Sequence, residues 1–208
     1  SSVLSHAKAA ANAGADVFKV QMFVPDEPLF CPMPGDDQRW EWWRKTLISY
    51  DDWRRIKWFC EAQMNIEFMA SVFQRTAVMW LKELGVRHYK VASRAAGDYP
   101  FDLAGGPFII SNGFDLYRHS NYEPTGEEKI LLCVSEYPAP LAKSRWRPAY
   151  DGISDHSGTI WPSIDALARG AEIVEVHFVV GEDTGPDAKV SLTVEQLSLI
   201  CEARDSFK

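Results

Sequence analysis

Gly152-Ile-Ser-Asp-His-Ser-Gly158 and Ile173-Val-Glu-Val-His-Phe178 are two short apolar runs that each lead into a histidine. Each run is typical of a strand, and a helical pattern over 161–169 lies between them. A strand, a helix and a second strand in succession form a parallel pair, so both carboxyl ends lie at the same edge of the sheet. We therefore expect His156 and His177 to be neighbours, and two adjacent imidazoles can hold a divalent metal.

The same alternation of strands and helices extends over the rest of the chain. Helical patterns are expected over 4–14, about 51–63 (with Asp51-Asp52 as its cap), 75–84, 161–169 and from Thr193 onward. Runs that are apolar on both faces, typical of buried parallel strands, occupy 16–21, 66–71, 89–93, 108–111, 129–135, 152–155 and 173–180. This order predicts an α/β fold with a parallel sheet covered by helices.

Seven strands are one fewer than a closed (β/α)₈ barrel requires, and the chain starts within a helical pattern where the first strand should already have been passed. The connections at 94–107, 114–128 and 139–150 are too short for a full helix with its loops. We expect a single domain over residues 1–208: a TIM-type (β/α)₈ barrel that lacks its first strand and is incomplete at the N-terminus.

Composition excludes two classes of partner. The net charge of −7 argues against binding of duplex nucleic acid, which needs a basic face, but it allows local lysines to bind a small anion. No apolar run reaches membrane-spanning length and no signal peptide is apparent. The four cysteines are widely spaced without a Cys-x-x-Cys pair, as for core thiols in a reducing compartment, so the expected location is cytoplasmic.

Polar residues recur where strands end, and in a barrel these ends meet at one mouth. Lys19 and Lys90 lie within otherwise apolar strands, where a lysine is costly without an anionic partner. The serines alone would cap strand ends more often than bind a ligand, and Glu175 could orient a ligand or close an ion pair. The Pro- and Trp-rich segment 22–50 is either an aromatic cover or a substrate lid.

These motifs, taken in order, resemble the sialic acid synthase family, whose members condense phosphoenolpyruvate with an N-acetylated amino sugar. The resemblance runs from about residue 13 to residue 195 and covers nearly the whole chain. Its most specific motifs are Lys-x-Gln at 19–21, Phe68-Met-Ala-Ser-Val-Phe73, Tyr89-Lys-Val-Ala-Ser93, Ser111-Asn-Gly113, Tyr137-Pro-Ala-Pro140, Ser154-Asp-His-Ser157, Glu175-Val-His-Phe178 and Gly185-Pro-Asp187.

The resemblance implies a barrel that binds phosphoenolpyruvate and an amino sugar, with Mn²⁺ or Mg²⁺ held by His156 and His177. It places Asp187 near the sugar and gives catalytic roles to Lys19, Lys90, His156 and Asp187. The metal would activate the sugar aldehyde, the enol carbon would attack it, and water addition would expel phosphate. The residues implied to bind phosphoenolpyruvate are Lys19, Gln21, Ser71, Lys90, Ser93, Ser111, Ser135 and Tyr137.

The sequence departs from the family pattern in three ways. A first-strand glutamate has no counterpart, and Ala95 stands where the family has a second carboxylate. The small C-terminal antifreeze-like domain, which lends an arginine to the partner subunit's sugar site in family dimers, does not follow; a homodimer is left open. Two alternatives therefore remain: another synthase that joins phosphoenolpyruvate to an aldose, and a degenerate barrel that binds ligands without turnover.

Overall fold

The computed structural model describes residues 2–114, 125–181 and 185–207. Over that part of the chain, seven parallel strands form one sheet in which each strand pairs with the next in sequence. This confirms the predicted α/β fold and the seven predicted strands. Strands β1 to β7 comprise Val17–Met22, Glu67–Val72, Tyr89–Val91, Phe108–Asn112, Lys129–Cys133, Gly152–Asp155 and Ile173–Val176.

The sheet curls into a half-barrel whose two outer strands, β1 and β7, do not pair with each other in the described ranges. A strand that preceded the first helix would lie beside β1, because a strand, a helix and the next parallel strand make a right-handed crossover. The open side between β7 and β1 is therefore the place of a first barrel strand, and the sheet is the predicted TIM-type barrel without it.

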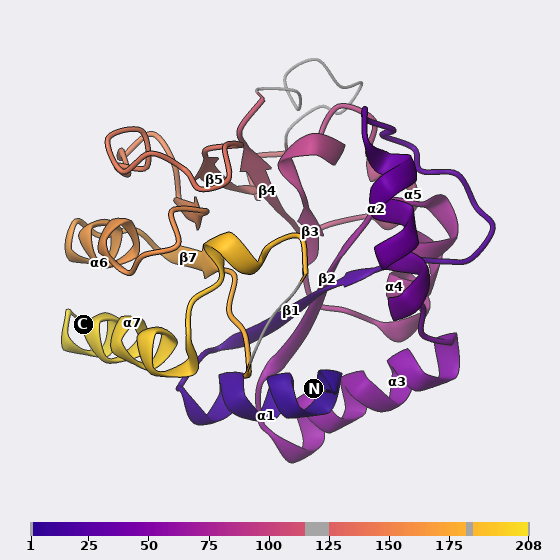
Figure 1. Ribbon diagram of the computed structural model, residues 1–208, viewed down its shortest axis with the longest axis horizontal. Helices are drawn as coiled ribbons and strands as arrows, with labels where there is room; N and C mark the ends of the chain where they lie inside the picture. The colour runs from indigo at the N-terminus through magenta and orange to yellow at the C-terminus, as the bar shows by residue number, and fades with distance from the viewer. Residues whose placement is uncertain (1, 115–124, 182–184, 208) are drawn as a thin grey trace.

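Helices pack on the outside of the curl along much of the sheet (Figure 1). Within the described ranges, none of them is long and apolar enough to cross a membrane. Helices α1 to α7 comprise Val3–Asn12, Asp36–Trp43, Tyr50–Trp58, Arg75–Leu84, Phe101–Ala104, Trp161–Ala168 and Val194–Ser206.

Helix α3 begins slightly earlier than predicted. Its cap is Ser49, whose hydroxyl accepts a hydrogen bond from the Asp52 amide, so the predicted cap at Asp51-Asp52 was wrong. The two aspartates lie in the first turn instead, where the positive end of the helix dipole favours acidic side chains. The helical segment continues through a π-helical turn to Gln63, which is the predicted end.

Two of the short connections confirm the prediction that outer helices are incomplete. Segment 94–107 holds a 3₁₀ turn and the four-residue helix α5, and 139–150 holds turns without a helix. Most of the third connection, 114–128, lies outside the described residues. The segment after β1 is a long loop that carries the short helix α2, as predicted.

Alternation along the strands explains why polar residues meet at the mouth. Inward positions are two residues apart, and on β2, β4, β5 and β7 they change toward the carboxyl end from an apolar side chain to one with a hydroxyl, thiol or carboxylate. Met69, Ile109 and Leu131 form a small buried cluster inside the curl, with Ile173 packed against it. The next inward positions are Ser71, Ser111, Cys133 and Glu175, which line a cavity.

The C-terminal helix α7 contacts both the first and the last helix of the outer layer that precede it in the chain. Helix α7 packs against both α6 and α1. From α7, Arg204 donates hydrogen bonds to the Gly14 carbonyl at 2.9 Å and to Asp16 at 2.6 Å, in the turn between α1 and β1. The outer helical layer is therefore continuous across the side where the inner strands do not pair.

Candidate active site

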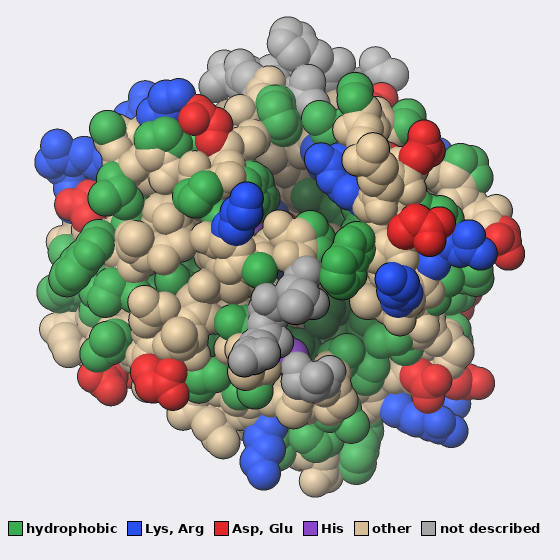
Figure 2. Space-filling model, in the orientation of Figure 1, with side chains coloured by type: hydrophobic (Ala, Val, Ile, Leu, Met, Phe, Trp, Pro, Cys, Tyr) green, Lys and Arg blue, Asp and Glu red, His purple; other side chains and the backbone are tan. Residues whose placement is uncertain are grey.

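The carboxyl ends of the strands surround a cavity of about 420 Å³. The space-filling view is hollowed near its centre, where a histidine surface is visible (Figure 2). Every site residue predicted from the sequence lies on this one cavity, although its role in binding or catalysis stays a prediction. The residues concerned are Lys19, Gln21, Ser71, Lys90, Ser93, Ser111, Ser135, Tyr137, His156, His177 and Asp187.

A carboxylate between two ammonium groups forms the floor of the cavity. Glu175 lies 3.2 Å from Lys19 Nζ through one oxygen and 3.5 Å from Lys90 Nζ through the other. Burial alone would raise the pKa of Glu175, but Lys19 and Lys90 outweigh it and hold that pKa far below its usual range. Glu175, left open between two roles by the sequence, therefore forms ion pairs with Lys19 and Lys90.

Lys90 is the most deeply buried charge at this site, with 3% of its side chain exposed. Burial lowers its pKa, which the neighbouring Glu175 partly offsets. Its ammonium group donates hydrogen bonds to Ser111 Oγ at 2.7 Å and to the Val91 carbonyl at 3.1 Å. These contacts fix the Lys90 Nζ position at the end of β3, where it can meet an anionic ligand.

Two serine hydroxyls lie close together beside the lysines. The Gly113 amide donates to Ser93 Oγ at 2.7 Å, and a Cβ on Gly113 would lie 2.3 Å from Ser135 Oγ. Only glycine lets these two hydroxyls approach the chain so closely. Ser135 Oγ is buried and has no hydrogen-bond partner among the described residues. A buried hydroxyl without a partner is costly, so Ser135 is suited to bind a ligand oxygen.

His156 follows β6 and is held in one tautomer. Its Nδ1 lies 3.0 Å from the Val134 carbonyl, which can only accept, so Nδ1 carries the proton and Nε2 the lone pair. Nε2 then accepts from the Tyr137 hydroxyl at 3.0 Å, and the two rings stack with centroids 4.4 Å apart. Burial lowers the pKa of His156 and keeps the ring neutral.

His177 follows β7, and its ring centroid lies 5.2 Å from that of His156, as the strand pattern predicted. Burial, and next the positive charge of Lys19, lower the pKa of His177 to about 4 despite the nearby Asp187. His177 Nδ1 and Asp187 Oδ2 are 3.8 Å apart. Both rings are thus neutral at pH 7, which is the state that binds metals.

The donor set is incomplete for a preformed metal centre. Within the described ranges, no group of three or more His, Cys, Asp or Glu side chains is arranged to hold a metal ion. The two imidazoles fit such an ion, with Asp187 beside His177 and with Tyr137 bonded to the free nitrogen of His156. Metal binding therefore stays a prediction, and it requires the Tyr137 hydroxyl to release that nitrogen.

Two arginines on the cavity wall were not found by sequence reasoning. Arg94 follows Ser93 directly and bonds to Asp36 of α2 and to the Cys31 carbonyl, which ties the long loop to the mouth. Arg39 of α2 also lines the cavity and bonds to Asp36 at 2.9 Å. A charge immediately after a strand end could have indicated Arg94, whereas the Trp-rich loop gave no signal for Arg39.

Ala95, the position of the missing family carboxylate, does not face the cavity. It is fully buried in the hydrophobic core, in the 3₁₀ turn after β3. Arg94 is the residue of this turn, besides Ser93, that lines the cavity. The turn therefore presents the guanidinium group of Arg94 to the cavity, and Ala95 contributes no group to it.

Known proteins similar to this chain include two synthases from Campylobacter jejuni. An N,N'-diacetyllegionaminic acid synthase is 29% identical over 66% of this chain and 48% of its own length. A pseudaminic acid synthase is 26% identical over 96% of this chain and 67% of its own. The chain thus spans half to two thirds of the length of these relatives.

The fold also has a counterpart among solved structures. The N-acetylneuraminic acid synthetase from Leptospira borgpetersenii, in complex with citrate, superposes with a TM-score of 0.76 over 99% of this chain and 77% of that one, at 23% identity. The sequence model of the NeuB family matches residues 6–207. This match covers nearly the whole chain and agrees with the resemblance found in the sequence, so the chain belongs to the NeuB family.

Proposed function

We propose that this chain condenses phosphoenolpyruvate with an N-acylated amino aldose, such as N-acetylmannosamine, to a nonulosonic acid and releases phosphate. The observation that carries the proposal is the Lys19–Glu175–Lys90 arrangement at the floor of the cavity. Two ammonium groups with one carboxylate between them leave a positive charge for a ligand. Membership of a family of sugar-acid synthases agrees with this chemistry.

Phosphoenolpyruvate carries a carboxylate and a phosphate, and the cavity offers partners for both. Lys19 and Lys90 supply charge-assisted hydrogen bonds, which are the stronger kind for such groups. Ser93, Ser111 and Ser135 supply hydroxyls on adjacent strand ends. Glu175 is the counter-ion that the two lysines share.

In the proposed reaction the enol carbon of phosphoenolpyruvate attacks the aldehyde carbon of the open-chain sugar, which forms one C–C bond. Water adds to the adjacent oxocarbenium carbon, and the proton it loses neutralises the alkoxide left by the aldehyde oxygen. The new hydroxyl of the tetrahedral intermediate then becomes the ketone as its C–O bond to phosphate breaks, and its proton leaves with the phosphate. Lys19 and Lys90 balance the negative charge throughout. Asp187 lies at the rim beside His177, where it can accept a hydrogen bond from a sugar hydroxyl.

Mn²⁺ or Mg²⁺ held by His156 and His177 would supply Lewis-acid polarisation of the aldehyde. The neutral state of both rings supports this assignment, and so does the Val134 carbonyl, which orients His156 as outer partners orient metal-binding histidines. Titration calorimetry with Mn²⁺ tests it: His156→Ala should abolish binding, and normal binding by this variant would refute the assignment.

The decisive experiment measures phosphate release from phosphoenolpyruvate with a panel of aldoses, with and without Mn²⁺. We expect turnover with N-acylated amino hexoses. Preference for a sugar without an amide would favour another phosphoenolpyruvate-dependent synthase. Binding of phosphoenolpyruvate without release of its phosphate in the presence of any of these sugars would favour a non-catalytic barrel. The supporting observation for this alternative is that Glu175 is already paired with both lysines.

A further inference from the structure

We propose that the outer face of the sheet carries a second anion site, which binds a small ligand with several phosphates, such as a nucleoside triphosphate. The site is a groove of about 1350 Å³ along β5, here called the outer groove. It meets the active-site cavity at Cys133 and Ser135, which line both. Its charged residues lie outside the active site, so the inference does not depend on the proposed reaction.

The groove exists because the connection from β5 to β6 lacks a helix. In a barrel, a helix normally follows each strand and covers its outer face. Residues 134–151 are all described and form turns and extended chain instead. The outer face of β5 is therefore bordered by a strap, 142–150, with α6 on its other side at Arg169.

A buried tryptophan holds this strap in place, so that two arginine side chains point into the groove. Trp146 is 5% exposed and packs in a separate core cluster with Ile153 of β6 and Ala166 of α6. Its indole nitrogen donates to the Tyr150 carbonyl at 3.1 Å. In extended chain, the residues on either side of a buried one point the opposite way, and Arg145 and Arg147 are indeed exposed. Both line the groove.

The groove is strongly positive although the chain is acidic overall. Among the described residues that line it, four are cationic (Lys143, Arg145, Arg147 and Arg169) and one, Glu136, is acidic. Glu136 pairs with Lys143, and Arg169 pairs with Asp165 of its own helix. For Arg145 and Arg147 the described residues provide no ion pair within 4.0 Å. These two guanidinium groups are free to bind an anion.

These properties select the class of ligand. Guanidinium groups bind phosphate oxygens in a bidentate manner, and two of them on one strap match adjacent phosphates of a polyphosphate chain. The volume exceeds what a nucleotide-sized molecule needs. The net charge of −7 repels polyanions from most of the surface, so binding must depend on this local cluster.

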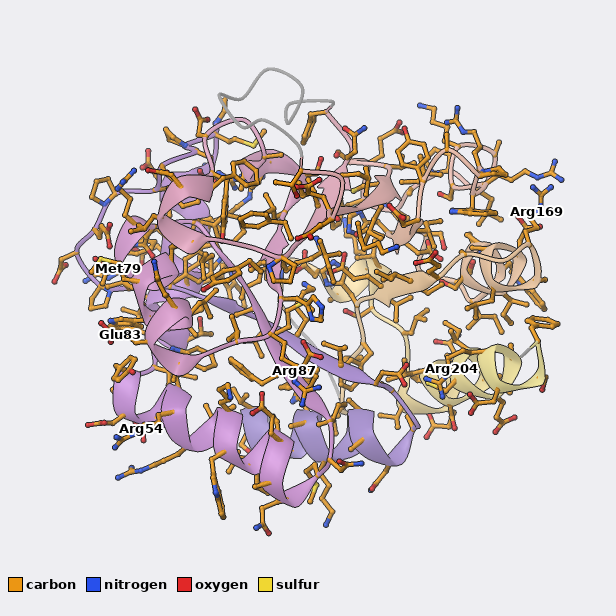
Figure 3. All side chains as sticks on the ribbon, turned by 180° about the vertical axis from the view of Figure 1, so that it is seen from behind. Arg54, Met79, Glu83, Arg87, Arg169 and Arg204 are labelled. Atoms are coloured by element: carbon orange, nitrogen blue, oxygen red, sulfur yellow. The ribbon has the colours of Figure 1, made fainter. Side chains whose placement is uncertain are left out.

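Calorimetric titration with tripolyphosphate and ATP tests the site. The variant Arg145→Gln/Arg147→Gln should lose at least tenfold in affinity for both probes. The matched control is Arg54→Gln/Arg55→Gln, which removes two exposed arginines of α3. Figure 3 shows Arg54 and Arg169 at opposite edges of the molecule. The control should bind within twofold of the parent protein.

Equal affinity of the parent and of Arg145→Gln/Arg147→Gln for the probes would overturn the proposal. It would mean that the probes bind elsewhere, for example in the active-site cavity. Equal loss in both double variants would also overturn it, because the attraction would then depend on overall charge alone. Phosphate release from phosphoenolpyruvate is measured separately on the same proteins. If the protein shows no turnover but binds tripolyphosphate through Arg145 and Arg147, the proposed function is refuted and the anion site in the outer groove is supported.

Discussion

Glu175 determines the charge of the active-site cavity, because it is the carboxylate that both lysines share. Lys19 and Glu175 are each about one fifth exposed or less, and Lys90 is almost fully buried, so solvent screens these pairs only weakly. Removing the carboxylate leaves two ammonium groups close together without a counter-ion. A phosphate or carboxylate of a ligand would restore the balance.

We expect Glu175→Gln to lower the free energy of unfolding by about 3 kcal/mol, since breaking a buried pair leaves an uncompensated charge. Phosphoenolpyruvate should raise the melting temperature of this variant more than that of the parent. The control is Glu172→Gln, which removes an exposed partner of Lys129 and should cost less than about 1 kcal/mol. Equal destabilisation by Glu175→Gln and Glu172→Gln in urea titrations would contradict the idea that Glu175 neutralises two buried lysines.

Lys90→Met should weaken phosphoenolpyruvate binding by about thirtyfold, which corresponds to about 2 kcal/mol for a lost charge-assisted hydrogen bond. Methionine preserves the length and apolar stem of the side chain, so the core around β3 should remain filled. Isothermal titration measures the effect, with Lys82→Met on the exposed face of α4 as control. An unchanged affinity of Lys90→Met for phosphoenolpyruvate would show that Lys90 does not bind this ligand.

Sequence reasoning placed the strand-end residues in one cavity because alternation and parallel order determine which way a strand side chain points. The role of Glu175 could not be predicted. The alternation of the strand showed which face of the sheet carries this residue, but its partners, Lys19 and Lys90, come from two distant strands, β1 and β3. The position of Arg39 on the cavity wall could not be predicted for another reason. Its direction depends on how the loop after β1 folds back over Arg94, and no periodic pattern encodes such a contact.

Pairing between β6 and β7 brings the two histidines together, and Gly152 allows it. A Cβ at this position would lie 1.9 Å from the Ile173 carbonyl oxygen of β7. Since that atom is backbone, it cannot turn away as a side chain could. The distance between His156 and His177 thus depends on a glycine four residues before the first of them.

Gly152→Ala should therefore destabilise the protein by more than about 3 kcal/mol, as for severe overpacking. Gly126→Ala is the comparison: Gly126 has a φ of +86° and nothing within 4 Å of an added Cβ. It should cost only about 1 kcal/mol, for the left-handed backbone. Chemical denaturation of both variants separates the steric effect from the conformational one, and a similar loss in each would refute the clash.

Helix α2 is tied to the barrel by Asp36, and this tie should depend on pH. Burial would raise the pKa of Asp36, but hydrogen bonds from Arg94, the Met33 amide and Arg39 outweigh it and lower that pKa from 3.8 to about 2. A depressed carboxyl pKa stabilises the folded state fully above the unfolded value of about 4. The contribution is lost as the pH falls from there toward 2.

At pH 7, Asp36→Asn should reduce the free energy of unfolding by about 2 kcal/mol, and the difference from the parent should shrink at pH 3. Asp37→Asn on the exposed side of the same helix should change it by less than about 0.5 kcal/mol. Urea titrations at several pH values measure both. A difference for Asp36→Asn that stayed constant between pH 7 and pH 3 would show that the carboxyl charge does not hold α2.

The helical layer runs from α6 through α7 to α1, across the side where the inner strands β7 and β1 do not pair in the described ranges. The strand count and the early helix predicted an incomplete barrel, because a parallel strand is recognisable from its apolar run alone. The role of α7 could not be foreseen, since the Arg204 contacts join residues 188 to 190 positions apart. Helix α7 thus holds the first and last units together where no strand pairing does.

This arrangement makes β1 and β7 the least protected strands of the sheet. All residues of β3 and β4 are buried, whereas every residue of β7 is half-buried and Val17 of β1 is 37% exposed. Hydrogen exchange followed by mass spectrometry should show amides of β1 and β7 exchanging at least about tenfold faster than those of β3 and β4. Equal protection of all four strands would mean that another chain pairs with the open edges, which sedimentation would detect as a dimer.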